Sequence, residues 1–108
     1  MENMILRTVL GDVPVSELGM ILPHEHLFTD LRGPDTLGYA QDDPNLVIDT
    51  MKPYLAAAED AGVTALIECS TVGVGRNIEI LQRLAEQTRI HIIAPTGIYK
   101  EAFTPEAY

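Results

Sequence analysis

The chain has 108 residues, of which 46% are hydrophobic and 21% charged, and these values are typical of one small soluble globular domain. Its formal net charge of −9 argues against binding to nucleic acids or to anionic membrane surfaces, because both require basic patches. The single cysteine, Cys69, cannot form an internal disulfide, which fits a cytoplasmic protein. We see no signal peptide at the N-terminus and no apolar run near the ~20 residues of a membrane span.

The N-terminal part of the sequence predicts a β-hairpin followed by a buried strand. Apolar and β-branched residues flank Gly11-Asp12, so we expect a hairpin over about residues 4–18 with its turn at that dipeptide. Pro14 cannot donate to a sheet ladder, and its arm should therefore lie at an edge. The apolar run that follows predicts a strand over about residues 19–24.

Helices and strands alternate in the rest of the sequence. After a long polar loop, apolar residues recur at three- and four-residue spacing and predict a helix over about 44–61, which Pro53 should kink or restart. A second helix over about 77–88 follows from the same periodicity. Two nearly continuous apolar runs, over about 63–69 and 90–95, predict strands that are buried on both faces.

This order of elements predicts the α/β class with a parallel sheet and right-handed crossovers. Three strands cannot close a barrel, because a (β/α)8 barrel takes eight strands and ~250 residues. The sequence is therefore either a very small open α/β unit or the first part of a larger protein, and we favour the second interpretation.

The tripeptide His24-Glu25-His26, at the end of the first buried strand, is the strongest candidate for chemistry. On an extended strand both imidazoles point to one face and Glu25 to the other, with the histidines roughly 6.5 to 7 Å apart. Two such imidazoles can bind one metal ion, although at least one further protein ligand is then needed. The alternative is a pair of polar residues on a solvated loop.

Three stretches, taken in order, form a pattern more specific than His-x-His. Gly19 to Leu27 contains Gly-x-x-Leu-x-His-Glu-His, and Glu68 to Asn77 contains Gly-x-Gly-Arg after the second buried strand. Thr96-Gly97-Ile98-Tyr99 forms a turn after the third. Together they resemble the N-terminal third of the phosphotriesterase family, within the amidohydrolase superfamily of metal-dependent barrels, and the resemblance covers essentially the whole chain.

The resemblance implies the N-terminal part of a (β/α)8 TIM barrel preceded by a short β-hairpin, with residues 1–108 as a single partial domain. It also implies two divalent metal ions, usually zinc, at the carboxyl-terminal mouth of the barrel. His24 and His26 match two ligands of the more buried metal. A hydroxide activated by the metals would then attack a lactone, a carboxyl ester or a phosphotriester.

The resemblance also suggests roles for residues around the pair. Tyr99 matches an aromatic position that lines the substrate pocket, and the alternative is ordinary packing of a half-buried phenol. Glu25 and Glu68 are candidates to orient a ligand histidine, and for each the alternative is a buried carboxylate paired with another group. Arg76 and Asn77 are interpreted as structural loop residues, with Asn77 in place of the family's usual aspartate.

The remaining family ligands come from strands four to eight, and no position here matches them, so we expect the 108-residue chain alone to be inactive. The leading hypothesis is the N-terminal segment of a zinc-dependent hydrolase that acts on ester bonds of a small molecule. One alternative is a non-catalytic truncated fragment or association module. Another is an amide or cyclic-imide hydrolase of the superfamily, against which Thr96-Gly97-Ile98-Tyr99 argues. Family members are often dimers, which leaves a homodimer open for the full-length protein.

Overall fold

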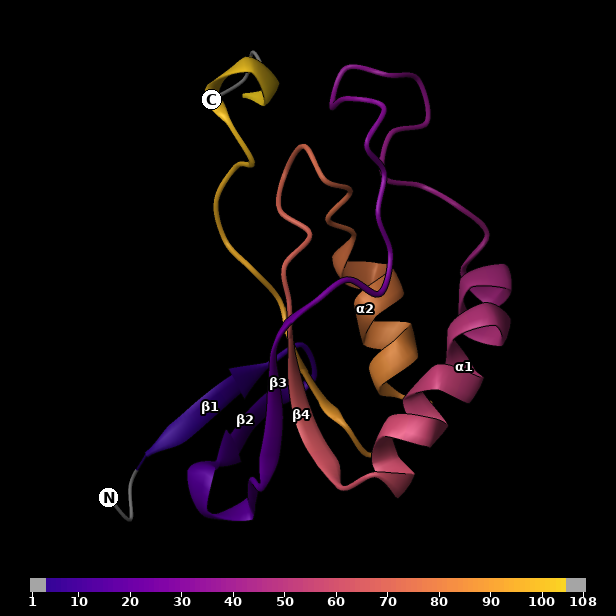
Figure 1. Ribbon diagram of the computed structural model, residues 1–108. Helices are drawn as coiled ribbons and strands as arrows, with labels where there is room; N and C mark the ends of the chain where they lie inside the picture. Colours follow the sequence, from indigo (N-terminus) through magenta and orange to yellow (C-terminus); the bar gives the residue numbers. More distant parts are fainter. Residues whose placement is uncertain (1–3, 105–108) are drawn as a thin grey trace.

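A three-stranded parallel sheet with two helices packed against it forms the centre of the computed structural model, which describes residues 4–104 (Figure 1). The sheet order is β3-β4-β5, and a separate hairpin of β1 and β2 precedes it. The α/β class predicted from the sequence is therefore confirmed. The elements are β1 (Ile5–Thr8), β2 (Gly11–Pro14), a 3-10 turn (Val15–Glu17), β3 (Met20–Glu25), α1 (Pro44–Asp60), β4 (Val63–Glu68), α2 (Ile78–Ala85), β5 (His91–Ile93) and a second 3-10 turn (Glu101–Phe103).

The hairpin turns earlier than the sequence predicts. Thr8 pairs with Gly11, so the turn is Val9-Leu10, and Gly11-Asp12 belongs to the second strand. The Thr8 hydroxyl closes the turn, because it donates to the Gly11 carbonyl and accepts from the Leu10 amide. The Val9 amide also donates to the Ile92 carbonyl at 2.9 Å. Docking on β5 thus fixes a turn that the local Gly-Asp signal placed two residues later.

Parallel pairing sets the direction of all three sheet strands. Strand β4 lies in the middle, and its residues Ala65 and Leu66 pair with β3 on one side and with β5 on the other. Both residues are almost fully buried, as expected for a central parallel strand covered on its faces. The carboxyl ends of β3, β4 and β5 therefore meet at one edge, from which three loops rise (Figure 1).

Helix α1 runs without interruption through Pro53, so the prediction of a restart at this residue is wrong. Pro53 is exposed, and solvent can reach the backbone carbonyl that its missing N–H leaves without a partner. Asp43 caps the helix by accepting from the Asn45 amide. Gly62 follows the helix with a φ of 96°, as a glycine after a helix end commonly does. No helix within residues 4–104 is long and apolar enough to cross a membrane.

Helix α2 and strand β5 are shorter than their predicted ranges of 77–88 and 90–95. The reason is a carboxylate from α1: Glu59 accepts from the Thr88 hydroxyl and from the Arg89 amide at 2.6 Å. These bonds hold Thr88 and Arg89 in the connection between α2 and β5, outside both elements. The apolar periodicity predicts a buried stripe of Ile78, Leu81, Leu84 and Ala85. Leu81, Leu84 and Ala85 are buried in the core, whereas Ile78 at the start of the helix is 41% exposed.

Two loops approach each other most closely at Gly75. This residue has a φ of 106°, and a Cβ built on it would lie 2.3 Å from the Asp30 amide nitrogen. The Asp30 amide in turn donates to the Val74 carbonyl at 2.8 Å. Only glycine accommodates both the left-handed backbone and this contact.

We therefore expect Gly75→Ala to lower the free energy of unfolding by about 3 kcal/mol, the sum of left-handed strain and overpacking. Gly38→Ala is the matched control, because Gly38 has a φ of 77° but open space around its Cβ position. It should cost only ~1 kcal/mol of backbone strain. Urea unfolding of both variants measures the difference, and equal losses would contradict the steric argument.

Candidate metal centre

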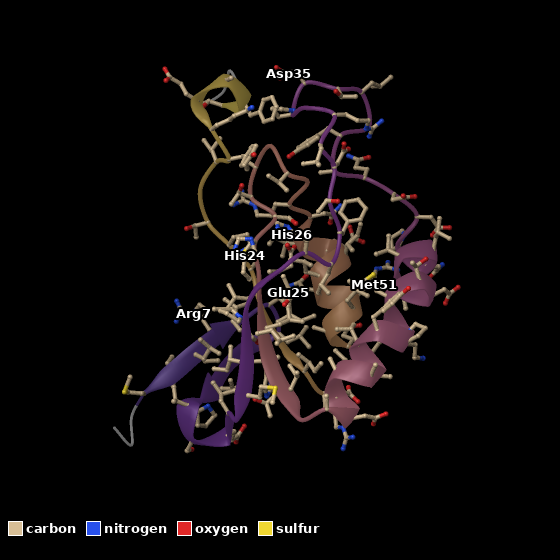
Figure 2. All side chains as sticks on the ribbon, viewed as in Figure 1. Arg7, His24, Glu25, His26, Asp35 and Met51 are labelled. Atoms are coloured by element: carbon tan, nitrogen blue, oxygen red, sulfur yellow. The ribbon has the colours of Figure 1, made fainter. Side chains whose placement is uncertain are left out.

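His24 and His26 leave the carboxyl end of β3 side by side. Their ring centroids are 5.3 Å apart and the rings are inclined by 65°. Figure 2 shows the two imidazoles together at the strand end, with Glu25 set apart from them. The pairing of β3 with β4 is irregular between Leu22 and Glu25, and the two imidazoles nevertheless lie side by side, as the His-x-His spacing predicts.

A pocket of about 440 Å³ opens over the two imidazoles. Its volume falls in the range of small-molecule sites. All three loops at the carboxyl edge of the sheet contribute to it, and most of its lining is apolar. The lining residues are His24, His26, Thr29, Leu31, Cys69, Thr71, Val74, Ile98 and Tyr99.

Two buried polar residues, Ser70 and Glu68, lie beside the His26 ring. The His26 Nδ1 lies 2.9 Å from the Ser70 hydroxyl oxygen and 3.8 Å from a Glu68 carboxylate oxygen. The same Glu68 oxygen accepts from the Ser70 amide at 2.6 Å, and both residues are almost fully buried. Burial raises the pKa of the Glu68 carboxyl, and hydrogen bonds from Ser70 oppose that rise.

This chain fits part of a metal site. A ligand histidine commonly binds through one ring nitrogen and directs the other to a hydrogen-bond partner, which fixes ring orientation. In His26 the Nδ1 has such a partner, and the Nε2 is left for a metal. Within residues 4–104, however, no group of three or more His, Cys, Asp or Glu side chains lies close enough together to hold a metal ion. The two imidazoles fit zinc chemistry but supply only some of its ligands.

Of the other predicted site residues, Tyr99 lines this pocket and Glu25 does not. Tyr99 lines it and is about half exposed, with its ring 5.9 Å from that of Phe103. Glu25 is half-buried and does not line it. Glu25 instead contributes its carbonyl to the sheet, where it accepts from the Cys69 amide at 2.7 Å.

Arg76 and Asn77 lie behind the pocket, in the loop between β4 and α2. Arg76 donates to the Pro95 carbonyl at 3.4 Å and so connects this loop to the end of β5. Asn77 accepts from the Ile80 amide as the N-cap of α2. Its amide nitrogen also donates to the Ala40 carbonyl at 2.7 Å, a link to the preceding loop that sequence reasoning missed.

Sequence reasoning also missed three supporting residues: Asp30, Tyr39 and Ser70. Asp30 is buried and accepts from Arg32 through both carboxylate oxygens, at 2.9 and 2.7 Å, and from the Ala40 amide. The Arg32 guanidinium holds the pKa of the Asp30 carboxyl well below its usual range. The Asp-x-Arg spacing was the available signal for this pair, whereas nothing in the sequence marks Tyr39.

Comparison with known proteins identifies the family. Residues 4–108 match the profile of the Phosphotriesterase family. The chain belongs to this family. It is 32% identical to the N-acetyltaurine hydrolase of Rattus norvegicus, in an alignment that covers 90% of this chain and 36% of the relative.

Solved structures extend this result to the fold. One structure, described as the engineering of organophosphate hydrolysis activity from a weak promiscuous lactonase template, superimposes with a TM-score of 0.81 at 29% identity, over 97% of this chain and 33% of that chain. A mutant of the Deinococcus radiodurans PTE-like lactonase gives 0.79 at 28% identity, over 94% and 32%. The chain thus spans about a third of the length of its relatives, and its predicted fold as the N-terminal part of a TIM barrel is confirmed.

The Asp30–Arg32 pair generates a pH prediction. Because the folded-state pKa of Asp30 is depressed, its stabilisation is present above the unfolded pKa of ~3.9 and is lost as the pH falls below that value. Asp30→Asn should therefore be less stable than the unaltered protein at pH 7, and the gap should narrow between about pH 4 and pH 2.

Urea unfolding across this pH range measures the gap. Asp35→Asn is the control, because Asp35 is exposed at the tip of the same loop (Figure 2). A gap for Asp30→Asn that stays constant from pH 7 to pH 2 would contradict the prediction.

Proposed function

We propose that this chain forms the N-terminal part of a metal-dependent hydrolase of phosphotriesterase-like type, which acts on an ester bond in a lactone, a carboxyl ester or a phosphotriester. The observation that carries the proposal is the His24–His26 pair, which faces a pocket at the carboxyl edge of a parallel sheet. Catalytic groups of (β/α)8 barrels come from this edge. Membership of the phosphotriesterase family supports the same conclusion.

We propose that His24 and His26 hold zinc, together with ligands supplied from outside residues 4–104. Bound zinc would polarise the oxygen of the scissile group and lower the pKa of a water molecule. In this chain, Ser70 and Glu68 keep the His26 ring in place from the buried side of the site. Leu31 contributes to the apolar lining of the pocket beside the histidines.

Tyr99 is proposed as the wall of the pocket that contacts the substrate. It lines the pocket and is about half exposed, and backbone bonds on either side of Ile98 fix the turn that carries it. The Tyr99 amide donates to the Val72 carbonyl at 2.7 Å, and the Val72 amide donates to the Gly97 carbonyl. A phenol ring held in this way offers an apolar face to an acyl chain or lactone ring.

A second candidate is the hydrolysis of an N-acyl amide. The specific observation in its favour is the 32% identity with an N-acetyltaurine hydrolase. This likeness offsets the argument from Thr96-Gly97-Ile98-Tyr99 against amide substrates. A bound metal would polarise the carbonyl oxygen of an amide as well as that of an ester. A substrate panel is therefore needed to choose between the two.

We further propose a cytoplasmic location and a homodimeric assembly for the full-length protein. The location is supported by Cys69, which is a free thiol beside the pocket. The homodimer follows from the family resemblance alone, and size-exclusion chromatography with light scattering tests it.

The main test uses the protein expressed from its complete coding sequence, with metal content measured by mass spectrometry and hydrolysis measured on lactones, carboxyl esters, phosphotriesters and N-acyl amides. His24→Ala and His26→Ala should each lose bound zinc and at least ~100-fold of kcat/KM, because a direct ligand is removed. His91→Ala is the control, since His91 begins β5 at the opposite end of the sheet.

The same experiment separates the alternatives. Hydrolysis confined to amides would favour the second candidate over ester hydrolysis. A full-length protein with neither bound metal nor hydrolysis of any panel member would overturn the proposed function and favour a non-catalytic association module.

Removal of the Ser70 hydroxyl tests the support of His26 separately. Ser70→Ala should weaken zinc binding by about 10- to 100-fold, because the His26 ring loses the partner that orients it. Ser70→Thr keeps the hydroxyl and should restore most of the affinity. Chelator competition measures this affinity without an activity assay, with Ser16→Ala as the exposed control. Equal zinc affinity in Ser70→Ala and the unaltered protein would contradict the proposal that Ser70 orients the His26 ring.

A further inference from the structure

The hydroxyl of Tyr39 joins two of the loops that build the pocket. Its oxygen accepts hydrogen bonds from the amides of Gly73 at 2.5 Å and of Gly75 at 3.0 Å. Tyr39 belongs to the loop between β3 and α1, whereas both glycines belong to the loop between β4 and α2. We call this three-residue arrangement the Tyr39 clamp.

The glycine backbone is shaped to receive one oxygen atom. Gly73 and Gly75 have φ values of 98° and 106°, a left-handed conformation that side chains disfavour. Amides converging from such a backbone form a concave site that takes an electronegative atom. Here the Tyr39 oxygen occupies this site, and phenylalanine at position 39 would leave both amides without that partner.

Ala40, next to Tyr39, provides an independent sign that this loop is held in place. Its φ of 57° is the only positive value of a non-glycine residue within residues 4–104. Such a conformation is costly and persists where surrounding contacts impose it. Those contacts are present: the Ala40 amide donates to Asp30 at 3.0 Å, and its carbonyl accepts from Asn77 at 2.7 Å. Ala40 is also buried.

The clamp reaches the pocket through Gly73. A Cβ placed on Gly73 would lie 3.1 Å from the Cβ of Tyr99 and 3.0 Å from that of Phe103, so this backbone packs directly against the Tyr99 turn. Val74, between the two clamped glycines, lines the pocket itself. The position of the clamped backbone therefore sets the position of two pocket-lining residues.

We propose that Tyr39 is a positioning residue that fixes the pocket wall formed by Val74 and Tyr99 and so tunes substrate binding. Its effect on substrate rests on the proposed hydrolase function, whereas its effect on the loop backbone does not. Because Tyr39 neither lines the pocket nor touches the histidines, its loss should weaken substrate binding and leave the chemical step nearly unchanged.

The test is Tyr39→Phe in the protein expressed from its complete coding sequence. Hydrogen-exchange mass spectrometry on peptides covering residues 71–77 should show exchange faster by about tenfold, because two amides lose their acceptor. KM for the best panel substrate should rise about tenfold, with kcat changed less than about twofold. Tyr54→Phe is the matched control, because Tyr54 is 68% exposed on α1.

A second variant acts on the same loop from the other side. Asn77→Asp keeps an oxygen to cap α2 but loses the amide donor to the Ala40 carbonyl. It should also accelerate exchange in residues 71–77, by less than Tyr39→Phe. Unchanged exchange in Tyr39→Phe, or an equal change in Tyr54→Phe, would overturn the clamp. Faster exchange with unchanged KM would overturn its role in substrate binding.

Exchange does not require hydrolysis, so the two proposals fail separately. A protein with neither bound metal nor activity on the panel would overturn the proposed function, and the exchange of residues 71–77 would still decide whether Tyr39 fixes the wall.

Discussion

The parallel pairing of β3 with β4 is the constraint on which the candidate site depends. The register aligns Glu25 with Glu68, and the Cys69 amide donates to the Glu25 carbonyl at the last step of the ladder. His26 therefore emerges directly beside Ser70, although 44 positions separate them in the chain. A shift of one residue would turn the imidazoles to the opposite face.

Beyond this edge, polar contacts join the loops to one another. Asp30 bridges Arg32 and the Ala40 amide, and Tyr39 accepts from two glycine amides of the neighbouring loop. Buried hydrogen bonds of this kind are costly to break one at a time, because each leaves a desolvated group without a partner. They give the loop between β3 and α1 a single defined path without regular secondary structure.

The elements that the sequence predicts well are those governed by local periodicity. Most of the apolar stripe of α2 and the buried run of β4 depend on neighbouring residues, and the structure has them close to the expected positions. The errors arise where distant contacts decide. The turn at Val9-Leu10 is fixed by Ile92, and Glu59 of α1 holds Thr88 and Arg89 in the connection between α2 and β5.

The same distinction applies to the candidate site. The spacing of His24 and His26 is a local signal, since residues two apart on a strand point to the same face. Glu68 was recognised as an acid near this face, but Ser70 was not, because a serine after a strand has no distinctive pattern. Tyr39 could not be predicted from the sequence at all. Its partners are backbone amides, which leave no trace in the sequence apart from two glycines.

In the proposed enzyme, the strand ends and the loops that follow them have different roles. The strand ends hold the histidines through the sheet register, and that register tolerates few changes. The wall that faces the substrate belongs to loops joined by the Tyr39 clamp and by Asp30, and loops of barrels vary more freely than their strands. Substrate choice can therefore change within one fold while the histidine pair stays in place. This is consistent with relatives that share the fold and are named for different substrates, an N-acetyltaurine hydrolase and a PTE-like lactonase. In the proposed enzyme, the shape of the Val74–Tyr99 wall, rather than the His24–His26 pair, would then decide the substrate.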